Sequence, residues 1–148
     1  MTGQPRRGRG AGGGQFLPTM RPEAIGLELT DDEVVIDPAE QKREERLPLT
    51  IAELGVLCED AAKLAARSRT AFDTDWLAKR AGKNLVTEVG ETATRLPASY
   101  RAAHPEVEWA FISGMRDRVV HEHQDTDYGA VWDAIEVDIP EMRRKLGL

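Results

Sequence analysis

Apolar residues recur at helical spacing through most of the chain beyond its first third, and two long helices are predicted first. The first runs from about residue 51 to 68, and Thr50 with Glu53 forms a capping box that would start it. The second runs from about 75 to 95, where Asp73 or Thr74 could cap the start and Pro97 would end it. Their apolar stripes are Leu54, Leu57, Cys58, Ala61, Leu64 and Ala65, then Leu77, Ala81, Leu85, Val89, Ala93 and Leu96.

Two further helices are predicted in the last third of the chain, after a short helical turn near 98–103. They cover about 107–122 and 128–146, with a turn and a cap supplied by 125–127 and a bend expected at Pro140. Short connections between four main helices predict an all-α, up-and-down helical bundle. The apolar set is Trp109, Ile112, Met115, Val119 and Val120, then Val131, Trp132, Ile135, Ile139, Met142 and Leu146; Trp76 is also expected in the core.

The first 46 residues lack such a pattern. Residues 1–20 are rich in glycine and arginine, a composition that cannot bury enough apolar surface to order the chain. Residues 21–46 are acidic, with one short apolar patch at 34–36. We therefore expect a disordered or weakly ordered arm over 1–46, Gly/Arg-rich and then acidic, and a folded domain over 47–148.

Charge is distributed unevenly, although the whole chain carries a net charge of −6. Residues 1–21 hold four arginines and no acid, whereas 22–46 hold nine acids and three basic residues. The folded part is also acidic, which argues against a broad basic surface for nucleic acid. The single cysteine, Cys58, excludes an intrachain disulfide framework. No apolar run reaches the roughly 20 residues of a membrane span, so we expect a cytoplasmic protein without membrane contact.

Residues 114–123 hold the chemistry that the chain offers for a catalytic site. Asp117 and His121 are four residues apart and would share a helix face, so the carboxylate could fix the imidazole tautomer. Arg118 could join them. Arg116 lies five residues before His121, about 140° away on a straight helix. Their convergence would need a bent arginine side chain, a frayed helix end or a second copy of the chain, and the last suggests a homodimer.

The same residues have plainer interpretations. Their spacing alone favours a solvated, charged helix face with an ordinary Asp–His pair. A metal site would need His121, His123, Asp125 and Asp127, but alternating residues do not converge on a helix. No glycine-rich loop precedes a helix in the way that a phosphate-binding loop does. We therefore predict neither a metal nor a cofactor.

Several short motifs occur in a fixed order around this segment. They are Asn84-Leu85, Gly90-Glu91, Arg95-Leu96-Pro97, Pro105-Glu106-Val107 with Trp109, Gly114-Met115-Arg116-Asp117 with His121, Val131-Trp132 and Ile139-Pro140. In this series the chain resembles the HepT-like ribonuclease toxins of the HEPN superfamily, over roughly residues 47–148.

The resemblance implies an all-helical domain that dimerises, with the Arg-x4-6-His motifs of both subunits lining one cleft. It implies a metal-independent endoribonuclease in which Arg116 binds the scissile phosphate and His121 is the general acid/base. Asp117 would hold the polar position after the arginine. Glu91 would either form a helix-to-helix hydrogen bond or take part in catalysis.

One position departs from the family pattern. HepT-like toxins usually continue His-x-Tyr, and a partner nucleotidyltransferase of the MntA type silences the toxin by adding AMP to that tyrosine. Here the position is His123, which could assist or replace His121. The resemblance predicts the toxin of a type VII-like toxin–antitoxin pair with an MntA-type nucleotidyltransferase as antitoxin. The alternatives are a non-catalytic helical dimer that binds nucleotides or a nucleotidyltransferase, and a structural helical adaptor.

Overall fold

A computed structural model describes residue 35 and residues 37–121 and 125–148. Residues 37–121 and 125–148 belong to one compact domain. The disorder predicted for residues 1–20 falls outside the described ranges. Within those ranges no helix is long and apolar enough to cross a membrane.

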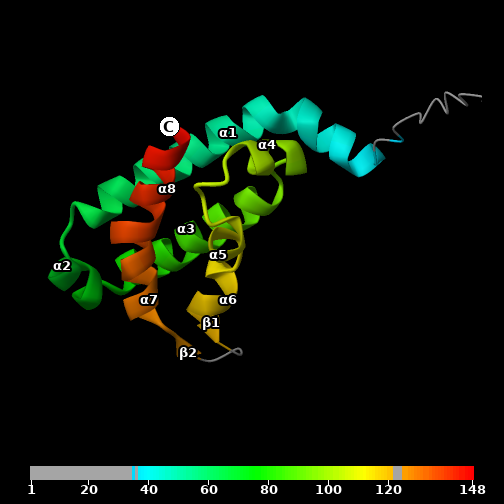
Figure 1. Ribbon diagram of the computed structural model, residues 1–148. Helices are drawn as coiled ribbons and strands as arrows, with labels where there is room; N and C mark the ends of the chain where they lie inside the picture. Colours follow the sequence, from blue (N-terminus) through cyan, green and yellow to red (C-terminus); the bar gives the residue numbers. More distant parts are fainter. Residues whose placement is uncertain (1–34, 36, 122–124) are drawn as a thin grey trace, which may run out of the picture. The chain divides into compact units, whose positions relative to one another are not determined.

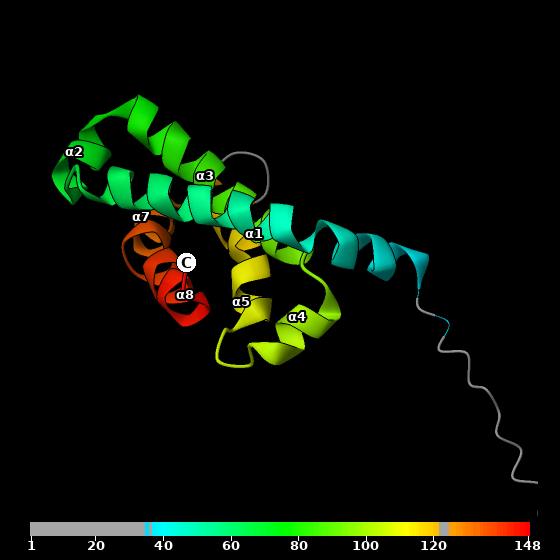
Figure 2. The ribbon, with the colours of Figure 1, turned by 90° about the horizontal axis from the view of Figure 1, so that it is seen from above.

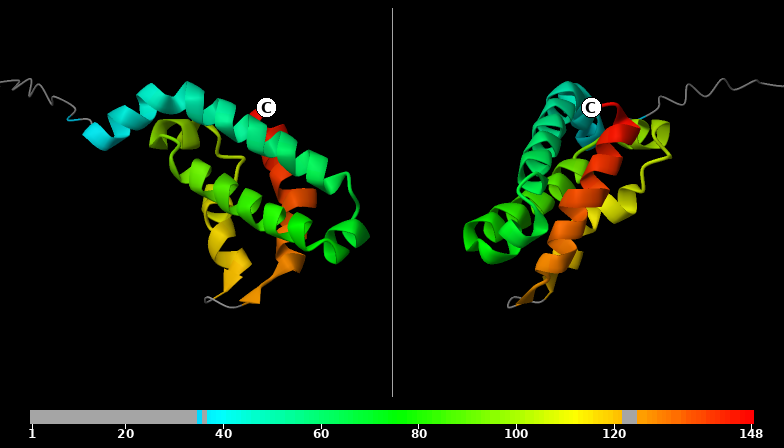
Figure 3. Two further views of the ribbon diagram at one scale, coloured as in Figure 1. Left: turned by 180° about the vertical axis from the view of Figure 1, so that it is seen from behind. Right: turned by 90° about the vertical axis from the view of Figure 1, so that its left-hand side faces the viewer.

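The domain is an all-α bundle, which confirms the fold class predicted from the sequence (Figure 1). Helix α1 lies along α3, and two further helical columns, α5–α6 and α7–α8, pack against them (Figures 1 and 3). The elements are α1 (Pro38–Ala65), α2 (Arg69–Thr74), α3 (Trp76–Thr94), α4 (Ala98–Ala103), α5 (Trp109–Ser113), α6 (Met115–Val119), β1 (Val120–His121), β2 (Asp125–Thr126), α7 (Tyr128–Asp133), the one-turn π-helix η1 (Ala134–Asp138) and α8 (Ile139–Leu146).

Helix α1 begins thirteen residues earlier than the sequence predicted, at Pro38 instead of about residue 51. The side chain of Asp37 caps it by accepting a hydrogen bond from the Ala39 amide at 2.9 Å. Thr50 therefore lies inside the helix, where its hydroxyl donates to the carbonyl of Arg46. The predicted boundary between arm and domain at 46/47 is wrong, because 38–46 are part of α1.

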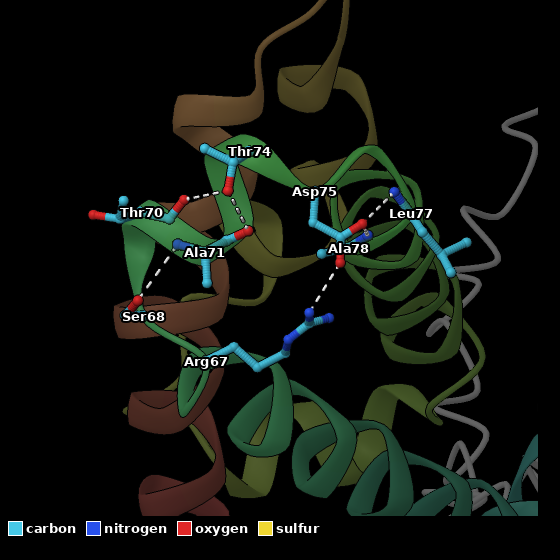
Figure 4. A network of polar contacts seen from close by, with 8 residues as sticks. All are labelled: Arg67, Ser68, Thr70, Ala71, Thr74, Asp75, Leu77 and Ala78. Carbon is cyan, nitrogen blue, oxygen red and sulfur yellow. Dashed lines mark hydrogen bonds and ion pairs between the residues drawn. The ribbon is translucent and has the colours of Figure 1, made fainter.

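A polar network joins α1, α2 and α3 (Figure 4). Ser68 adopts a positive φ of 72° and caps α2, a helix that the sequence did not predict. Asp75 caps α3, instead of Asp73 or Thr74, and accepts hydrogen bonds from the amides of Leu77 and Ala78. The Ala78 amide and the Arg67 guanidinium lower the pKa of the Asp75 carboxyl. This cap fixes the start of the helix that carries Glu91.

The core lies where α3 meets the other helices, and it confirms most of the predicted apolar stripes. Trp132 is buried and packs on Phe72, with 5.2 Å between the ring centroids. The expectation that Trp76 and Leu77 are core residues is wrong, since they are 70% and 60% exposed in the first turn of α3. A Cβ built at Gly82 would lie 2.8 Å from the Phe72 ring, so α3 approaches α2 closely there.

Cys58 lies in this core and is almost fully buried. Burial raises the pKa of the thiol to about 11, and the positive charge of Arg143 opposes that shift. The thiol is therefore protonated at neutral pH and has little nucleophilic character.

The prediction of one continuous helix over 107–122 is wrong, because the helical segment begins at Trp109, is interrupted and ends before residue 122. It is divided into α5 and α6 at Gly114, and it ends at Val119. Beyond that point β1 pairs antiparallel with β2, with His121 opposite Asp125. The amide of Asp127 donates to the Val119 carbonyl, and the Asp127 side chain caps α7 as predicted. A short strand pair therefore replaces the last turn of the expected helix.

The last predicted helix is present as α7, η1 and α8, and its irregularity falls one turn before Pro140. Proline has no amide proton to donate, so a helix must adjust its hydrogen bonding in the preceding turn. The π-helix η1 is that adjustment.

Candidate functional site

Helix α6 presents the candidate arginine from a position fixed by close packing on α3. A Cβ built at Gly90 would lie 3.2 Å from the carbonyl oxygen of Ile112 and 3.7 Å from the amide nitrogen of Arg116. Only glycine lets the two backbones approach this closely without displacement. Gly90 thus sets the distance between α3 and the start of α6.

Arg116 forms an ion pair with Glu91 across this contact. The Nη1 atom of Arg116 lies 3.5 Å from Oε1 of Glu91, and the two side chains are 61% and 55% exposed. Such an exposed pair contributes little stability. The guanidinium is therefore open to solvent and can exchange the carboxylate for a phosphate.

Arg118 points to a different part of the domain from Arg116. Its guanidinium lies 4.2 Å from the centroid of the Phe111 ring. Burial raises the pKa of the neighbouring Asp138 carboxyl, and the charge of Arg118 opposes that shift. Arg118 is engaged with the α5 and η1 side of the bundle, so the structure does not group it with Arg116.

The predicted helix face shared by Asp117 and His121 is wrong. Asp117 is exposed on α6, but His121 belongs to β1, because the helix ends at Val119. The 140° separation of Arg116 and His121 applies to a straight helix and does not hold here. The structure matches the alternative of a helix that ends before the histidine, so the geometric reason for a second chain disappears.

His123 lies in 122–124, outside the described residues, and its predicted accessory role stays a prediction. Within residues 37–121 and 125–148, no group of three or more metal-ligating side chains comes together. The described part of the site thus provides an exposed cation, Arg116, and the strand β1, which carries His121.

Sequence reasoning missed a cluster of four basic side chains outside residues 114–123. A cavity of about 290 Å³ between α1 and the end of α3 is lined by Lys42, Arg43, Arg46 and Arg95. The signal was available, since the first three share one side of a helix when residues 38–46 are helical. It was lost when this stretch was assigned to the arm.

Comparison with known proteins identifies the family. The sequence profile described as Ribonuclease HepT-like matches residues 55–147, which include the end of α1, all of α3 and the α6 site. The chain belongs to this HepT-like ribonuclease family. No solved structure matches the chain with statistical significance.

Named relatives agree with this membership. A protein named "Putative RNase" from Caldanaerobacter subterraneus subsp. tengcongensis is 33% identical over 75 residues, 51% of this chain and 67% of the relative. "Probable ribonuclease HepT" from Thermococcus cleftensis is 30% identical over 57 residues, 38% of this chain and 52% of the relative. Another "Putative RNase", from Methanocaldococcus jannaschii, is 30% identical over 57 residues, 38% of this chain and 49% of the relative.

The chain thus spans about half the length of the second and third of these relatives. Family membership and the names of the relatives support ribonuclease as the class of this protein. Its reaction, its substrate and its partners are subjects for a proposal.

Proposed function

We propose that the protein is a metal-independent endoribonuclease that acts as the toxin of a type VII-like toxin–antitoxin pair. The observation that carries this proposal is the exposed guanidinium of Arg116 on α6, within the region matched by the ribonuclease family. RNA supplies its own nucleophile, because a deprotonated 2′-hydroxyl attacks the adjacent phosphate. The protein then needs only a cation for the phosphate and a group that moves protons.

In this mechanism Arg116 binds the scissile phosphate and stabilises the charge that develops on it. His121 is the general acid/base that removes the proton of the 2′-hydroxyl or protonates the leaving oxygen. Asp117, exposed next to Arg116, orients the substrate by accepting a hydrogen bond. His123 is the substitute proton carrier.

The proposal includes a homodimer that works in the cytoplasm and an MntA-type nucleotidyltransferase as the cognate antitoxin. Two chains would place both Arg-x4-His motifs at one cleft. The antitoxin would need a route other than the family's tyrosine, because position 123 is a histidine.

The test is induced expression together with RNA cleavage in a chelator, with wild type compared with His121→Ala and Arg116→Ala. We expect growth arrest and cleavage by the wild type. We expect His121→Ala to lose about 10²- to 10⁴-fold in cleavage rate, the usual contribution of a proton-transfer group, and Arg116→Ala to lose about 10²- to 10³-fold, the usual contribution of one charge-stabilising donor. Arg144→Ala, an exposed arginine on α8, is the matched control and should cut normally.

The outcomes separate the assignments. An inert wild type defeats the enzyme proposal. Cleavage by His121→Ala at the wild-type rate moves the proton transfer to His123. Loss of cleavage in chelator that returns with added metal defeats the metal-independent mechanism.

A non-catalytic dimer that binds nucleotides or a nucleotidyltransferase is the second candidate. The Glu91 carboxylate beside Arg116 favours it, because this carboxylate competes with a substrate phosphate for the guanidinium. The net charge of −6 also repels RNA at long range. An inert wild type that still forms dimers would support this candidate.

A further inference from the structure

The cavity between the first half of α1 and the end of α3 is basic in an acidic protein. We call it the basic groove and define it by Lys42, Arg43, Arg46 and Arg95, with Glu53 as the one acid of its lining. Its lining contains no aromatic side chain on which a base could stack. A groove of this composition suits a repeated negative charge without sequence preference.

Two carboxylates in the acidic stretch of α1 contact α4, and one of them, Glu40, also pairs with Arg43 of the groove. Glu40 accepts a hydrogen bond from the Ala98 amide, and Glu44 accepts one from the Ser99 hydroxyl, both at the start of α4. These contacts hold the first half of α1 beside α4 (Figure 2). Helix α1 thus places Glu44 toward α4 and Lys42, Arg43 and Arg46 toward the groove.

Two of the cations are available to a ligand. Lys42 and Arg46 are exposed and form no ion pair within the part of the chain that the structure describes. Arg43 is partly neutralised by Glu40 at 3.1 Å, and Arg95 by Glu53 at 2.6 Å. Lys42 and Arg46 are four residues apart, so their side chains lie one above the other along α1.

The C-terminal end of α3 contacts both the basic groove and the site on α6. Arg95, which caps the end of α3, follows Glu91 by four residues, a rise of about 6 Å along a helix. Glu91 contacts Arg116, whereas Arg95 reaches α1 through Glu53. The last turn and the cap of α3 therefore connect Arg116 with the residues that line the groove.

We propose that the basic groove binds the sugar–phosphate backbone of the RNA strand that is cut at Arg116, at nucleotides beside the scissile bond. The proposal rests on the proposed function and names where its substrate extends. The contacts that the end of α3 makes with both the groove and Arg116 favour an RNA strand over an acidic peptide. Contacts to phosphates position a strand without reading its sequence.

The test measures binding of the full chain to a single-stranded 2′-O-methyl oligoribonucleotide, which lacks the attacking hydroxyl and cannot be cut. Fluorescence anisotropy over a series of KCl concentrations compares wild type with Lys42→Gln/Arg46→Gln. Arg80→Gln/Arg144→Gln is the matched control, because it removes the same charge from exposed residues outside the groove. Circular dichroism verifies that all three proteins are folded.

We expect the groove variant to lower the slope of log K against log salt by about 1.4, or about 0.7 for each lost phosphate contact, and to weaken binding about tenfold at physiological salt. The control should keep the wild-type slope. A groove variant with unchanged slope and affinity overturns the proposal, and so does a wild type that does not bind the oligonucleotide. Poly-glutamate serves as a second probe. A groove variant that loses binding to poly-glutamate but keeps binding to the oligonucleotide overturns the proposal in favour of an acidic peptide.

Binding to the uncleavable oligonucleotide is measured separately from cleavage, so the two proposals can fail independently. A wild type that binds through the groove but fails to cut RNA supports the groove and defeats the proposed nuclease. A wild type that cuts RNA, with a groove variant that binds and cuts as well, defeats the groove alone.

Discussion

Glu91 and Arg116 define a contact whose role can be decided by one substitution. In the structure the carboxylate competes with any phosphate for the guanidinium. Glu91→Gln removes that competition and leaves the packing of α3 unchanged. We expect KM for RNA to fall several-fold with kcat within about twofold, since the change affects ground-state and transition-state binding alike.

Steady-state cleavage of a short RNA substrate measures both constants. Glu88→Gln, one turn earlier on α3, is the control because it removes an equal charge from an exposed residue. A kcat reduced by 10²-fold or more would instead assign Glu91 a role in proton transfer.

Sequence reasoning identified Arg116 and Glu91 as residues of interest but could not decide their relation. Their contact depends on the packing of α6 on α3, which joins positions 25 apart in the chain.

The error at His121 has a different cause. Helical spacing was extended through Val120, whereas the structure pairs Val120 with Thr126 and His121 with Asp125, and helical periodicity does not predict this pairing.

The contact between α3 and α6 makes a prediction at the scale of elements. Gly90→Ala would place a methyl group 3.2 Å from the Ile112 carbonyl, so α5 and α6 must move by a few tenths of an ångström. Overpacking costs about 1–3 kcal/mol, which exceeds the gain of up to about 1 kcal/mol from the helix propensity of alanine. We expect a net loss of stability and a reduced rate of RNA cleavage.

Gly55→Ala is the matched control for this prediction. It lies within α1, and a Cβ there meets nothing within 4 Å. We expect it to stabilise the fold by up to about 1 kcal/mol and to leave cleavage unchanged. Urea denaturation with cleavage assays compares the two variants. Equal stabilisation by both substitutions would show that α3 and α6 are not in tight contact.

The sequence predicted some elements well and others poorly for identifiable reasons. Helix α3 has a continuous apolar stripe and a proline after its end, and its predicted bounds agree with the structure within a residue. The first turns of α1 have no apolar stripe, because 38–46 contact α4 through Glu40 and Glu44. Hydrophobic periodicity cannot detect a helix held by polar contacts.

The proposed homodimer is a prediction at the scale of the whole molecule. Light scattering at micromolar concentration should give twice the chain mass of 16.4 kDa. The physical reason is the shared cleft that the proposed function requires. A mass equal to one chain would mean that Arg116 and His121 act from a single subunit, which the transition from α6 to β1 does not prevent.

The fold class was predicted from the helical spacing of apolar residues and from short connections between the helices, and the structure has both features. The expectation of a dimer had two supports, and the structure removes one of them. The helical angle between Arg116 and His121 no longer applies, so the dimer rests on the resemblance to the family.

The two glycines that α3 places against its neighbours limit how the chain can change in length. Gly82 fits against Phe72 on one side, and Gly90 fits against the Ile112 backbone on another. Inserting one residue between them would turn one glycine about 100° away from its partner and shift it by about 1.5 Å. A bulkier side chain would then face the Phe72 ring or the Ile112 backbone without room for it. Insertions and deletions in related chains should therefore avoid the interval 82–90.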